Sequence, residues 1–344
     1  MLEVCQLQSG DAKAWDDYVQ LCPEASHSHL SGWRRVIERT YGHRAFYLWA
    51  RENGQIKGIL PLIGMRSLSL RRSLVSLPFL DDGGLCASDE PSRMKLYEAA
   101  YQLFEGQKAD FLDLRHRYRN SLDMPLVGSK VIPILELADH PDAMWKGFDA
   151  KLRNQVRKAL KSDLTATWSG IEGLADFYDV FALNMRDLGS PVHSRKFFAT
   201  IFAEFADSAK LMLVRKGTQT IGGAICFCFR DVLSVPWASS LRAYFALCPN
   251  NLLYWEMIRW GCSHGYRRFD FGRSSPGSGT YHFKQQWGPI DEPLHWQCLS
   301  RTPGHAAMPH ADNPRYQWLV QTWSHLPLAL TKVVGPWLRG RVSS

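Results

Sequence analysis

The 344-residue sequence lacks long apolar runs and cysteine patterns. No stretch reaches the roughly 18 consecutive apolar residues that a transmembrane helix needs. The first residues, MLEVCQLQSGDAKAWDD, have neither the cationic start nor the apolar core of a signal peptide. The eight cysteines include no Cys-x-x-Cys pair and no Cys/His cluster at metal-ligand spacing. These absences predict a cytoplasmic protein with reduced thiols and no structural metal.

A strong excess of charge of one sign is also missing. Lys and Arg number 41 against 33 Asp and Glu, which gives a net charge of +8. This excess is well short of a histone-like tail, yet it favours anionic partners such as phosphates, nucleic acid or a membrane surface. The apolar share of 45% and the charged share of 22% are those of an ordinary globular protein. A chain of this length corresponds to about two domains.

The two halves of the chain repeat one rhythm of extended and helical segments. A β-hairpin is predicted over residues 45–65, around an Asn-Gly turn, and another over residues 209–241. A helix follows each hairpin, over residues 92–106 and over residues 250–265, and Asn250 is the predicted N-cap of the second helix. The sequence therefore predicts a mixed α/β fold.

Weak internal matches indicate that this rhythm is a duplication. Three matches fall in the same order in both halves: Arg51, Gln55 and Gly58 with Arg215, Gln219 and Gly222; residues 76–79 with 234–237; and residues 111–115 with 268–273. We therefore predict two copies of one unit, in domains that span residues 1–130 and 131–300. Residues 301–344 are predicted to be a linker and an amphipathic helical tail.

A basic helix is predicted over residues 144–164, between the two hairpins. Arg153, Arg157 and Lys161 recur there at a spacing of four residues, with no acidic residue interleaved. Like charges at this spacing cost a few tenths of a kcal/mol each unless an anion faces them. The stripe indicates either an anion-binding face or a solvated helix surface.

The C-terminal segment, residues 316–341, predicts one or two helices rich in tryptophan. Trp318, Trp323 and Trp337 occur there among leucines and valines, with three cations as the only charges. An interfacial membrane helix has this composition. A tail that folds back on the protein, or a dimer contact, would explain it as well.

Six motifs together carry a family resemblance. They read LVSLPFLDDGG, KLRNQVRKALKSDL, NMRDLGSPVHSRKFF, VPWASS, CPNNLLYWEMIRW and YRRFDFGRSSPGSGTYHFKQQWG. As a set they resemble the FemAB-like branch of the GNAT acyltransferase superfamily, over residues 28–297. More closely, they resemble the subgroup that is associated with exosortase/PEP-CTERM systems, whose genes lie among exopolysaccharide genes.

The resemblance implies two tandem GNAT-like domains, with an activated donor bound in the second. The co-substrate would be acyl-CoA or aminoacyl-tRNA, and the acceptor would be an amine of a cell-envelope or exopolysaccharide precursor. One feature departs from ordinary GNAT enzymes. Residues 239–251 should hold the donor loop Gln/Arg-x-x-Gly-x-Gly/Ala, and they contain no glycine. This departure weakens the case for a CoA donor.

The resemblance also implies which residues would form the site. Lys284, in the motif YHFKQQWG, would bind donor phosphate or stabilise charge, although a surface lysine is the simple alternative. Asp270 and Arg273 would complete the catalytic set, unless they form a buried ion pair or hydrogen bonds at the strand end. The expected donor-binding residues are Arg153, Lys158, Trp237, Ser239, Asn250, Gly277, Gly279 and Tyr281. Asp81 and Asp82 would bind the acceptor amine, although a plain turn is the simpler explanation of this pair.

The expected chemistry is the attack of an amine on an ester or thioester. The site must hold donor and amine together, stabilise an oxyanion and remove a proton. The leading hypothesis is an N-acyltransferase of envelope or exopolysaccharide intermediates. The alternatives are a peptidoglycan-bridge aminoacyltransferase that uses aminoacyl-tRNA and a non-catalytic GNAT scaffold of an envelope assembly.

Overall fold

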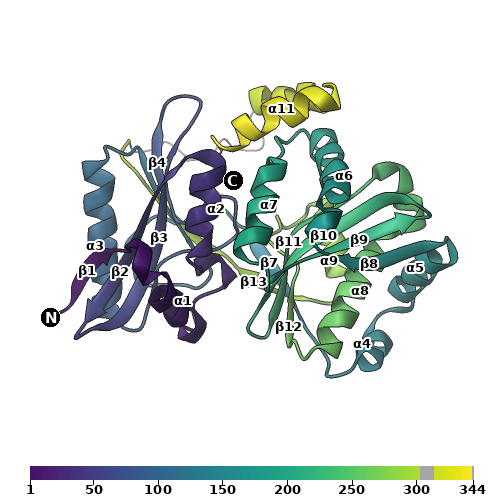
Figure 1. Cartoon of the computed structure of the whole chain (residues 1–344), viewed down its shortest axis with the longest axis horizontal. Helices are drawn as coiled ribbons and strands as arrows, with labels where there is room; N and C mark the ends of the chain where they lie inside the picture. Colours follow the sequence, from purple (N-terminus) through teal and green to yellow (C-terminus); the bar gives the residue numbers. More distant parts are fainter. Residues whose placement is uncertain (303–313, 343–344) are drawn as a thin grey trace. The chain divides into compact units, whose positions relative to one another are not determined.

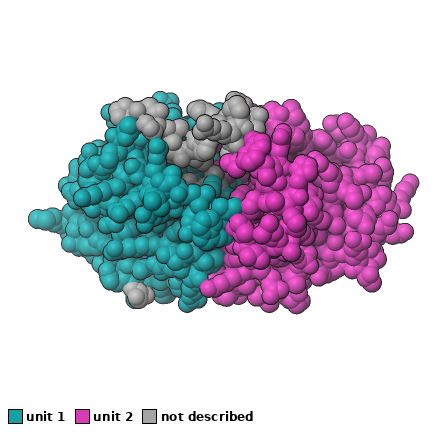
Figure 2. All heavy atoms as spheres, turned by 90° about the horizontal axis from the view of Figure 1, so that it is seen from above, with its two compact units in different colours: residues 1–129, 293–313, 337–344 teal, residues 130–292, 314–336 magenta. Residues whose placement is uncertain are grey.

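The computed structural model describes residues 1–302 and 314–342, and the chain divides into two compact units (Figure 2). Unit 1 consists of Met1–Ser129, Pro293–Asn313 and Trp337–Ser344, and unit 2 consists of Lys130–Glu292 and Pro314–Pro336. Within the described ranges, no helix combines the length and the apolar character that crossing a membrane requires.

Unit 1 is built around a seven-stranded mixed sheet (Figure 1). Its strands are β1 (Glu3–Gln6), β2 (Arg44–Glu52), β3 (Gln55–Arg66), β4 (Arg72–Val75), β5 (Cys86–Ala87), β6 (Phe111–His116) and β14 (His295–Ser300). They lie in the order β1-β2-β3-β4-β6-β14, with β5 paired to β3. Strands β4 and β6 run parallel, and the other pairs are antiparallel.

Helices cover both faces of this sheet because the side chains of β2 alternate between two apolar environments. The helices are α1 (Ala12–Leu21), α2 (Gly32–Tyr41) and α3 (Glu90–Gly106). Phe46 and Leu48 join the core beneath α3, together with Leu96 and Phe104 of that helix. Between them, Tyr47 points to the other face and packs against Trp15 of α1, with 5.1 Å between the ring centroids.

Unit 2 repeats this architecture. Its strands are β7 (Val131–Glu136), β8 (Leu164–Ser169), β9 (Ala209–Lys216), β10 (Gln219–Phe229), β11 (Val232–Ser240), β12 (Arg268–Asp270) and β13 (Ile290–Pro293), and its longer helices are α5 (Ala150–Lys161), α6 (Leu174–Asp187), α7 (Arg195–Glu204) and α8 (Pro249–Ser263). The strand order is β13-β7-β12-β11-β10-β9-β8, and β11 and β12 are the parallel pair. Helices α5 and α8 pack on one face, and α6 and α7 pack on the other.

The two central hairpins share one irregularity, which explains the matched glycines. In both hairpins one residue bulges out directly before the glycine, Lys57 before Gly58 and Ile221 before Gly222. A Cβ on Gly58 would lie 2.8 Å from Leu96 Cδ1, and one on Gly222 would lie 2.5 Å from Ser240 Oγ. The predicted fold class, two mixed α/β units, is confirmed by the two sheets.

One strand of the unit 1 sheet lies beyond unit 2 in the sequence. Strand β7 pairs with β12 of its own unit, whereas β14 follows β13 of unit 2 and pairs with β6 of unit 1. Residues 293–300, which we expected in the second domain, thus belong to unit 1. The side chain of Trp296 explains this placement, because its Nε1 donates to the Asp81 carbonyl at 3.0 Å and Arg115 stacks over its ring at 4.4 Å.

The basic helix expected over residues 144–164 is interrupted. It consists of α4 (Pro141–Gly147) and α5, and Phe148 and Asp149 between them are extended, with ψ of 150° and 147°. Phe148 is 7% exposed and packs edge-on against Trp287 at 5.3 Å. The helix breaks where this ring is buried.

The predicted cap of the later helix was wrong. Cys248 occupies the N-cap position of α8, with φ of 59°, and Asn250 lies inside the first turn. The tail contains two helices as expected, α10 (Pro314–Ser324) and α11 (Leu328–Arg339). Part of the expected linker, residues 303–313, lies outside the described residues.

Candidate functional site

The parallel strands β11 and β12 pair over three residues and then separate. Val232–Ser234 pair with Arg268–Asp270. Directly after Ser234, one extra residue bulges out of β11, in the stretch that contains Pro236. Strand β11 then continues along β10 to Ser240, whereas the chain after Asp270 no longer pairs with β11 and stays bonded to β7 through the bridge between Ser274 and Val131. In α/β sheets, ligands bind outside the carboxyl ends of strands at such separations, and bulges are frequent beside active sites.

Hydrogen bonds fix the end of β11 to the helices beside it. Asn184 of α6 donates its Nδ2 to Ser239 Oγ at 2.9 Å. The next residue, Ser240, donates its hydroxyl to Asn250 Oδ1 of α8 at 2.6 Å. Both serines are buried, so the predicted residues Ser239 and Asn250 lie at the separation and are held from opposite faces of the sheet.

Three cations gather at the loop that follows β12. Lys284, on α9 (Gly279–Gln285), is 8% exposed and donates its Nζ to the carbonyl oxygens of Gly272 at 2.7 Å and Arg273 at 3.2 Å. It is therefore not a surface lysine. Lys130 donates its Nζ to Ser275 Oγ of the same loop. Burial and the nearby charge of Arg273 lower the pKa of Lys130, and an anion bound there would relieve this repulsion.

Lys130 was missed in the sequence analysis. It directly precedes β7, and the antiparallel pairing of β7 with β12 brings it to the 272–278 loop. No local pattern around Lys130 indicates this pairing, because its partner lies more than 130 residues further along the chain.

Aromatic packing fixes α9 and thereby the position of Lys284. Tyr254 of α8 stacks on Phe271 at 5.5 Å and meets Phe283 of α9 at 5.3 Å. Trp287, directly after α9, packs against Phe148. The motif FDFGR…HFKQQWG thus places its apolar residues in the core beneath α8, while Asp270 ends β12 and Lys284 lies on α9.

Other predicted residues of this loop have internal hydrogen bonds. Asp270 is buried, and its Oδ1 accepts from the Gly272 amide at 2.7 Å. Tyr281 donates its hydroxyl to Asp291 Oδ2 at 2.7 Å, and this bond raises the pKa of Tyr281. These contacts hold both residues at the site and leave their functional roles as predictions.

The loop itself combines a tight turn with an unsatisfied hydroxyl. Gly277 has a φ of 80°, which favours glycine, and Gly279 begins α9. Ser274 is 4% exposed, and its Oγ has no hydrogen-bond partner among the described residues. A buried hydroxyl of this kind is a place where water or a ligand group is expected.

Two expected donor-binding residues have contacts in other places, and a third is exposed. Arg153, on α5, donates to the Lys146 carbonyl at 3.4 Å, and Lys158 is exposed on the same helix. Trp237 points to the α6–α7 face, where it packs edge-on against Phe198 at 5.4 Å. Their donor-binding role stays a prediction that these contacts do not support.

The acidic pair of unit 1 is engaged within that unit. Asp82 is buried and accepts from Ser26 Oγ at 2.8 Å and from the Arg117 guanidinium at 3.4 Å. Burial alone would raise the pKa of Asp82, but the charge of Arg117 lowers it below its usual value. Asp81 offers its carbonyl to Trp296. In the part of the chain that the structure describes, no three His, Cys, Asp or Glu side chains could jointly hold a metal ion.

The comparison with protein families identifies the region that contains the β11–β12 separation. Residues 146–285 match the family described as the acetyltransferase (GNAT) domain. This region, less than half of the chain, is similar to a GNAT domain. The family match supports the predicted class of enzyme, a transferase. No curated protein matches the sequence. Membership of the PEP-CTERM-associated subgroup stays a prediction.

Solved structures resemble almost the whole chain. FemX has a TM-score of 0.66 at 16% identity and covers 87% of this chain and 97% of its own. A tandem GNAT protein from the clavulanic acid biosynthesis pathway has a TM-score of 0.56 at 12% identity, with coverages of 89% and 100%. The C-terminal domain of a putative lysylphosphatidylglycerol synthetase from Agrobacterium fabrum has a TM-score of 0.56 at 12% identity, with coverages of 86% and 92%. At these identities the likeness shows the fold alone, two tandem GNAT-like units.

Proposed function

We propose that the chain is an N-acyltransferase that moves an acyl or aminoacyl group from an activated donor to an amine of a cell-envelope or exopolysaccharide intermediate. The observation that carries this proposal is the separation of β11 from β12 after Ser234 and Asp270, inside the GNAT domain. The bulge in β11 would accommodate the donor carbonyl, and the cations at the 272–278 loop would bind the donor phosphates.

In the proposed mechanism, the donor lies along the part of β11 that β12 does not cover. Main-chain amides of β11 would hold the donor and stabilise the oxyanion that forms when the amine attacks. Lys130 and Arg273 would bind donor phosphates, and Lys284 would position their loop through its bonds to the Gly272 and Arg273 carbonyls. The Asp270 carboxylate, directly or through water, is the candidate acceptor of the proton that the amine loses.

The donor would be acyl-CoA or aminoacyl-tRNA, and neither would stay bound between turnovers. Two alternatives share the fold: a peptidoglycan-bridge aminoacyltransferase that binds tRNA, and a scaffold without catalysis. A donor panel separates them, because a scaffold transfers nothing and a tRNA-dependent enzyme ignores acyl-CoA.

We infer further that the protein acts in the cytoplasm at the inner face of the membrane, with its tail on an anionic lipid surface. Trp318 is 64% exposed, Val333 is 76% exposed and Trp337 is 54% exposed. The Arg341 guanidinium lies 4.0 Å from the centroid of the Trp337 ring. Exposed tryptophan next to arginine is typical of interfacial segments.

The test is mass spectrometry of amine acceptors incubated with the protein and either acetyl-CoA or a set of aminoacyl-tRNAs. Replacement of Arg273 or Lys130 by Ala should lower kcat/KM about 10- to 100-fold, because a charged hydrogen bond contributes about 1.5–3 kcal/mol. Lys196→Ala, an exposed lysine on α7, is the matched control. No transfer from any donor, or variants that behave like Lys196→Ala, would contradict the proposal.

A further inference from the structure

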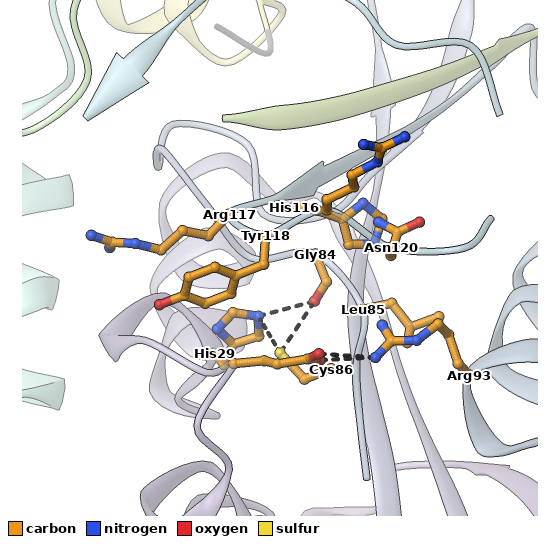
Figure 3. Close-up of a pocket in the computed structure, with 11 residues that line it drawn as sticks. His29, Gly84, Leu85, Cys86, Arg93, His116, Arg117, Tyr118 and Asn120 are labelled. Carbon is orange, nitrogen blue, oxygen red and sulfur yellow. Dashed lines mark hydrogen bonds and ion pairs between the residues drawn. The ribbon is translucent and has the colours of Figure 1, made fainter. Parts of the chain in front are cut away.

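Unit 1 contains a pocket beyond the carboxyl ends of its own parallel strand pair, β4 and β6 (Figure 3). The centre of a water-sized molecule can occupy about 10 Å³ of it, and the wider hollow of about 260 Å³ includes space that is open to solvent. The lining residues come from the segment after β4, from α3, from the segment after β6 and from the chain between α1 and α2. The pocket therefore occupies, in unit 1, the topological position that the β11–β12 separation occupies in unit 2.

His116 brings an unsatisfied ring to this pocket. The residue ends β6 and is 4% exposed, and neither of its ring nitrogens has a hydrogen-bond partner among the described residues. Burial and the charge of Arg93 lower the pKa of His116 to about 3, so the imidazole is neutral near pH 7 and carries one N–H donor and one acceptor. Buried polar atoms without partners are rare and indicate a missing water or ligand.

Asn120 adds donors of fixed orientation. Its Oδ1 accepts a hydrogen bond from the Leu122 backbone amide at 3.0 Å. This bond fixes the side-chain amide, so that Nδ2 of Asn120 points away from Leu122. That Nδ2 is buried and has no partner in the described part of the chain. Figure 3 shows Asn120 and His116 on the wall across the pocket from His29 and Cys86.

Other buried polar groups of the wall are already paired. His29 Nε2 lies 2.9 Å from the Gly84 carbonyl and 3.2 Å from Cys86 Sγ. Glu24 accepts two hydrogen bonds from Arg93, at 2.9 Å and 3.2 Å. The unsatisfied groups are thus those of Asn120 and His116, and among them N–H donors outnumber acceptors.

We propose that this pocket binds the carboxylate group of a small organic acid, with the Asn120 amide and the His116 N–H as its hydrogen-bond donors. A carboxylate accepts on two oxygens and donates nothing, which fits a surplus of donors. Arg119 is exposed and also lines the pocket, so it adds a positive charge, whereas the charge of Arg93 is balanced by Glu24. This site lies in unit 1, and its occupation does not depend on the transfer reaction proposed for unit 2.

The experiment titrates the full-length protein with N-acetylglycine and, as a neutral probe of the same size, N-acetylglycinamide. Binding is followed by calorimetry and by the ring ¹⁵N shifts of His116. We expect saturable binding of the acid, at least tenfold tighter than that of the amide, with a shift of the His116 ring signals. No saturable binding of the acid, equal binding of the amide, or binding of inorganic phosphate in place of the acid overturns the proposal.

Asn120→Asp tests the donor directly. It keeps the oxygen that accepts from Leu122 and replaces the amide nitrogen by a second oxygen, so affinity for N-acetylglycine should fall at least tenfold. Asn53→Asp, in the exposed β2–β3 turn, makes the same change in charge away from the pocket and should leave affinity unchanged. Equal affinity in Asn120→Asp and Asn53→Asp overturns the proposal. If Asn120→Asp fails to fold, the comparison of acid and amide on the unaltered protein still decides.

Discussion

The ammonium group of Lys284 closes the loop that follows β12. With 8% of the residue exposed, it donates to two backbone carbonyls, those of Gly272 and Arg273. Lys284→Ala would leave these acceptors without their partner, so we expect the free energy of unfolding to fall by about 1–3 kcal/mol. Urea unfolding measures this loss. Lys158→Ala removes an exposed lysine and should stay within about 0.5 kcal/mol.

The outcome for Lys284 also separates its two roles. If Lys284 positions the loop, Lys284→Ala should lower both the free energy of unfolding and kcat/KM, because the loop that contains Arg273 relaxes. If Lys284→Ala kept full stability and lost only donor affinity, the ammonium would contact the donor directly, as expected from the sequence. Full stability with full activity would contradict both roles.

Buried histidines make unit 1 sensitive to acid. Burial lowers the pKa of His27 to about 4 and that of His116 to about 3, whereas the unfolded chain binds these protons near pH 6.5. Between pH 6.5 and pH 4 the unfolded state holds more protons, so stability falls as the pH falls. The slope approaches about 1.4 kcal/mol per pH unit for each histidine.

Urea unfolding at pH 7, 6 and 5 checks this expectation. His116→Gln keeps a neutral polar group and removes one titrating ring, so its slope should be smaller by about one proton. Equal stability of the unaltered protein at pH 5 and pH 7 would show that these rings are not buried in the neutral form.

At the scale of the element, each bulged hairpin requires the glycine that follows its bulge. A Cβ on Gly58 would meet Leu96 Cδ1 at 2.8 Å and the Cys86 carbonyl oxygen at 2.9 Å, and the carbonyl is backbone that cannot move aside cheaply. We expect Gly58→Ala to destabilise unit 1 by about 1–3 kcal/mol. Gly106→Ala, at the end of α3 with open space around it, should instead stabilise by about 0.5–1 kcal/mol. Thermal unfolding of both variants gives the sign, and a neutral Gly58→Ala would contradict the close approach.

Local patterns predicted some elements correctly and could not predict others. The Asn53-Gly54 turn marks its hairpin because both residues take positive φ, 49° and 80°, which few other residue pairs adopt. Helix α4 and the break at Phe148 were missed, because the break depends on Trp255 and Trp287, which lie far along the chain. Alternation in 295–300 indicates a strand, but no local signal tells that β6 is its partner.

At the scale of the whole molecule, the same limit applies to the sites. The motif FDFGR…HFKQQWG contains residues that the fold does bring to one loop, Asp270, Arg273 and Lys284. Charge patterns on a helix face were poorer guides, since Arg153 donates to the Lys146 carbonyl and Lys158 is exposed on the same helix. The pocket of unit 1 was not predicted, because His116 and Asn120 become notable only through the partners that they lack after folding.

The tail offers the last prediction, at the scale of the molecule and its surroundings. Trp318 and Trp337 are 64% and 54% exposed, so their replacement by Ala should leave the free energy of unfolding within about 0.5 kcal/mol. The variant with both Trp318→Ala and Trp337→Ala should bind vesicles of phosphatidylglycerol and phosphatidylethanolamine at least about tenfold more weakly than the unaltered protein. Burial of a large apolar side chain contributes about 1.5–3 kcal/mol.

Cosedimentation with vesicles measures this difference, and Tyr101→Ala, an exposed aromatic residue of α3, is the control. Binding of the unaltered protein should weaken at 0.5 M salt, since cations of the tail contribute through a screened attraction to the anionic lipid. Equal sedimentation of the double variant and Tyr101→Ala would assign the exposed tryptophans to a protein partner or a second copy of the chain, because a lipid surface would then gain nothing from them.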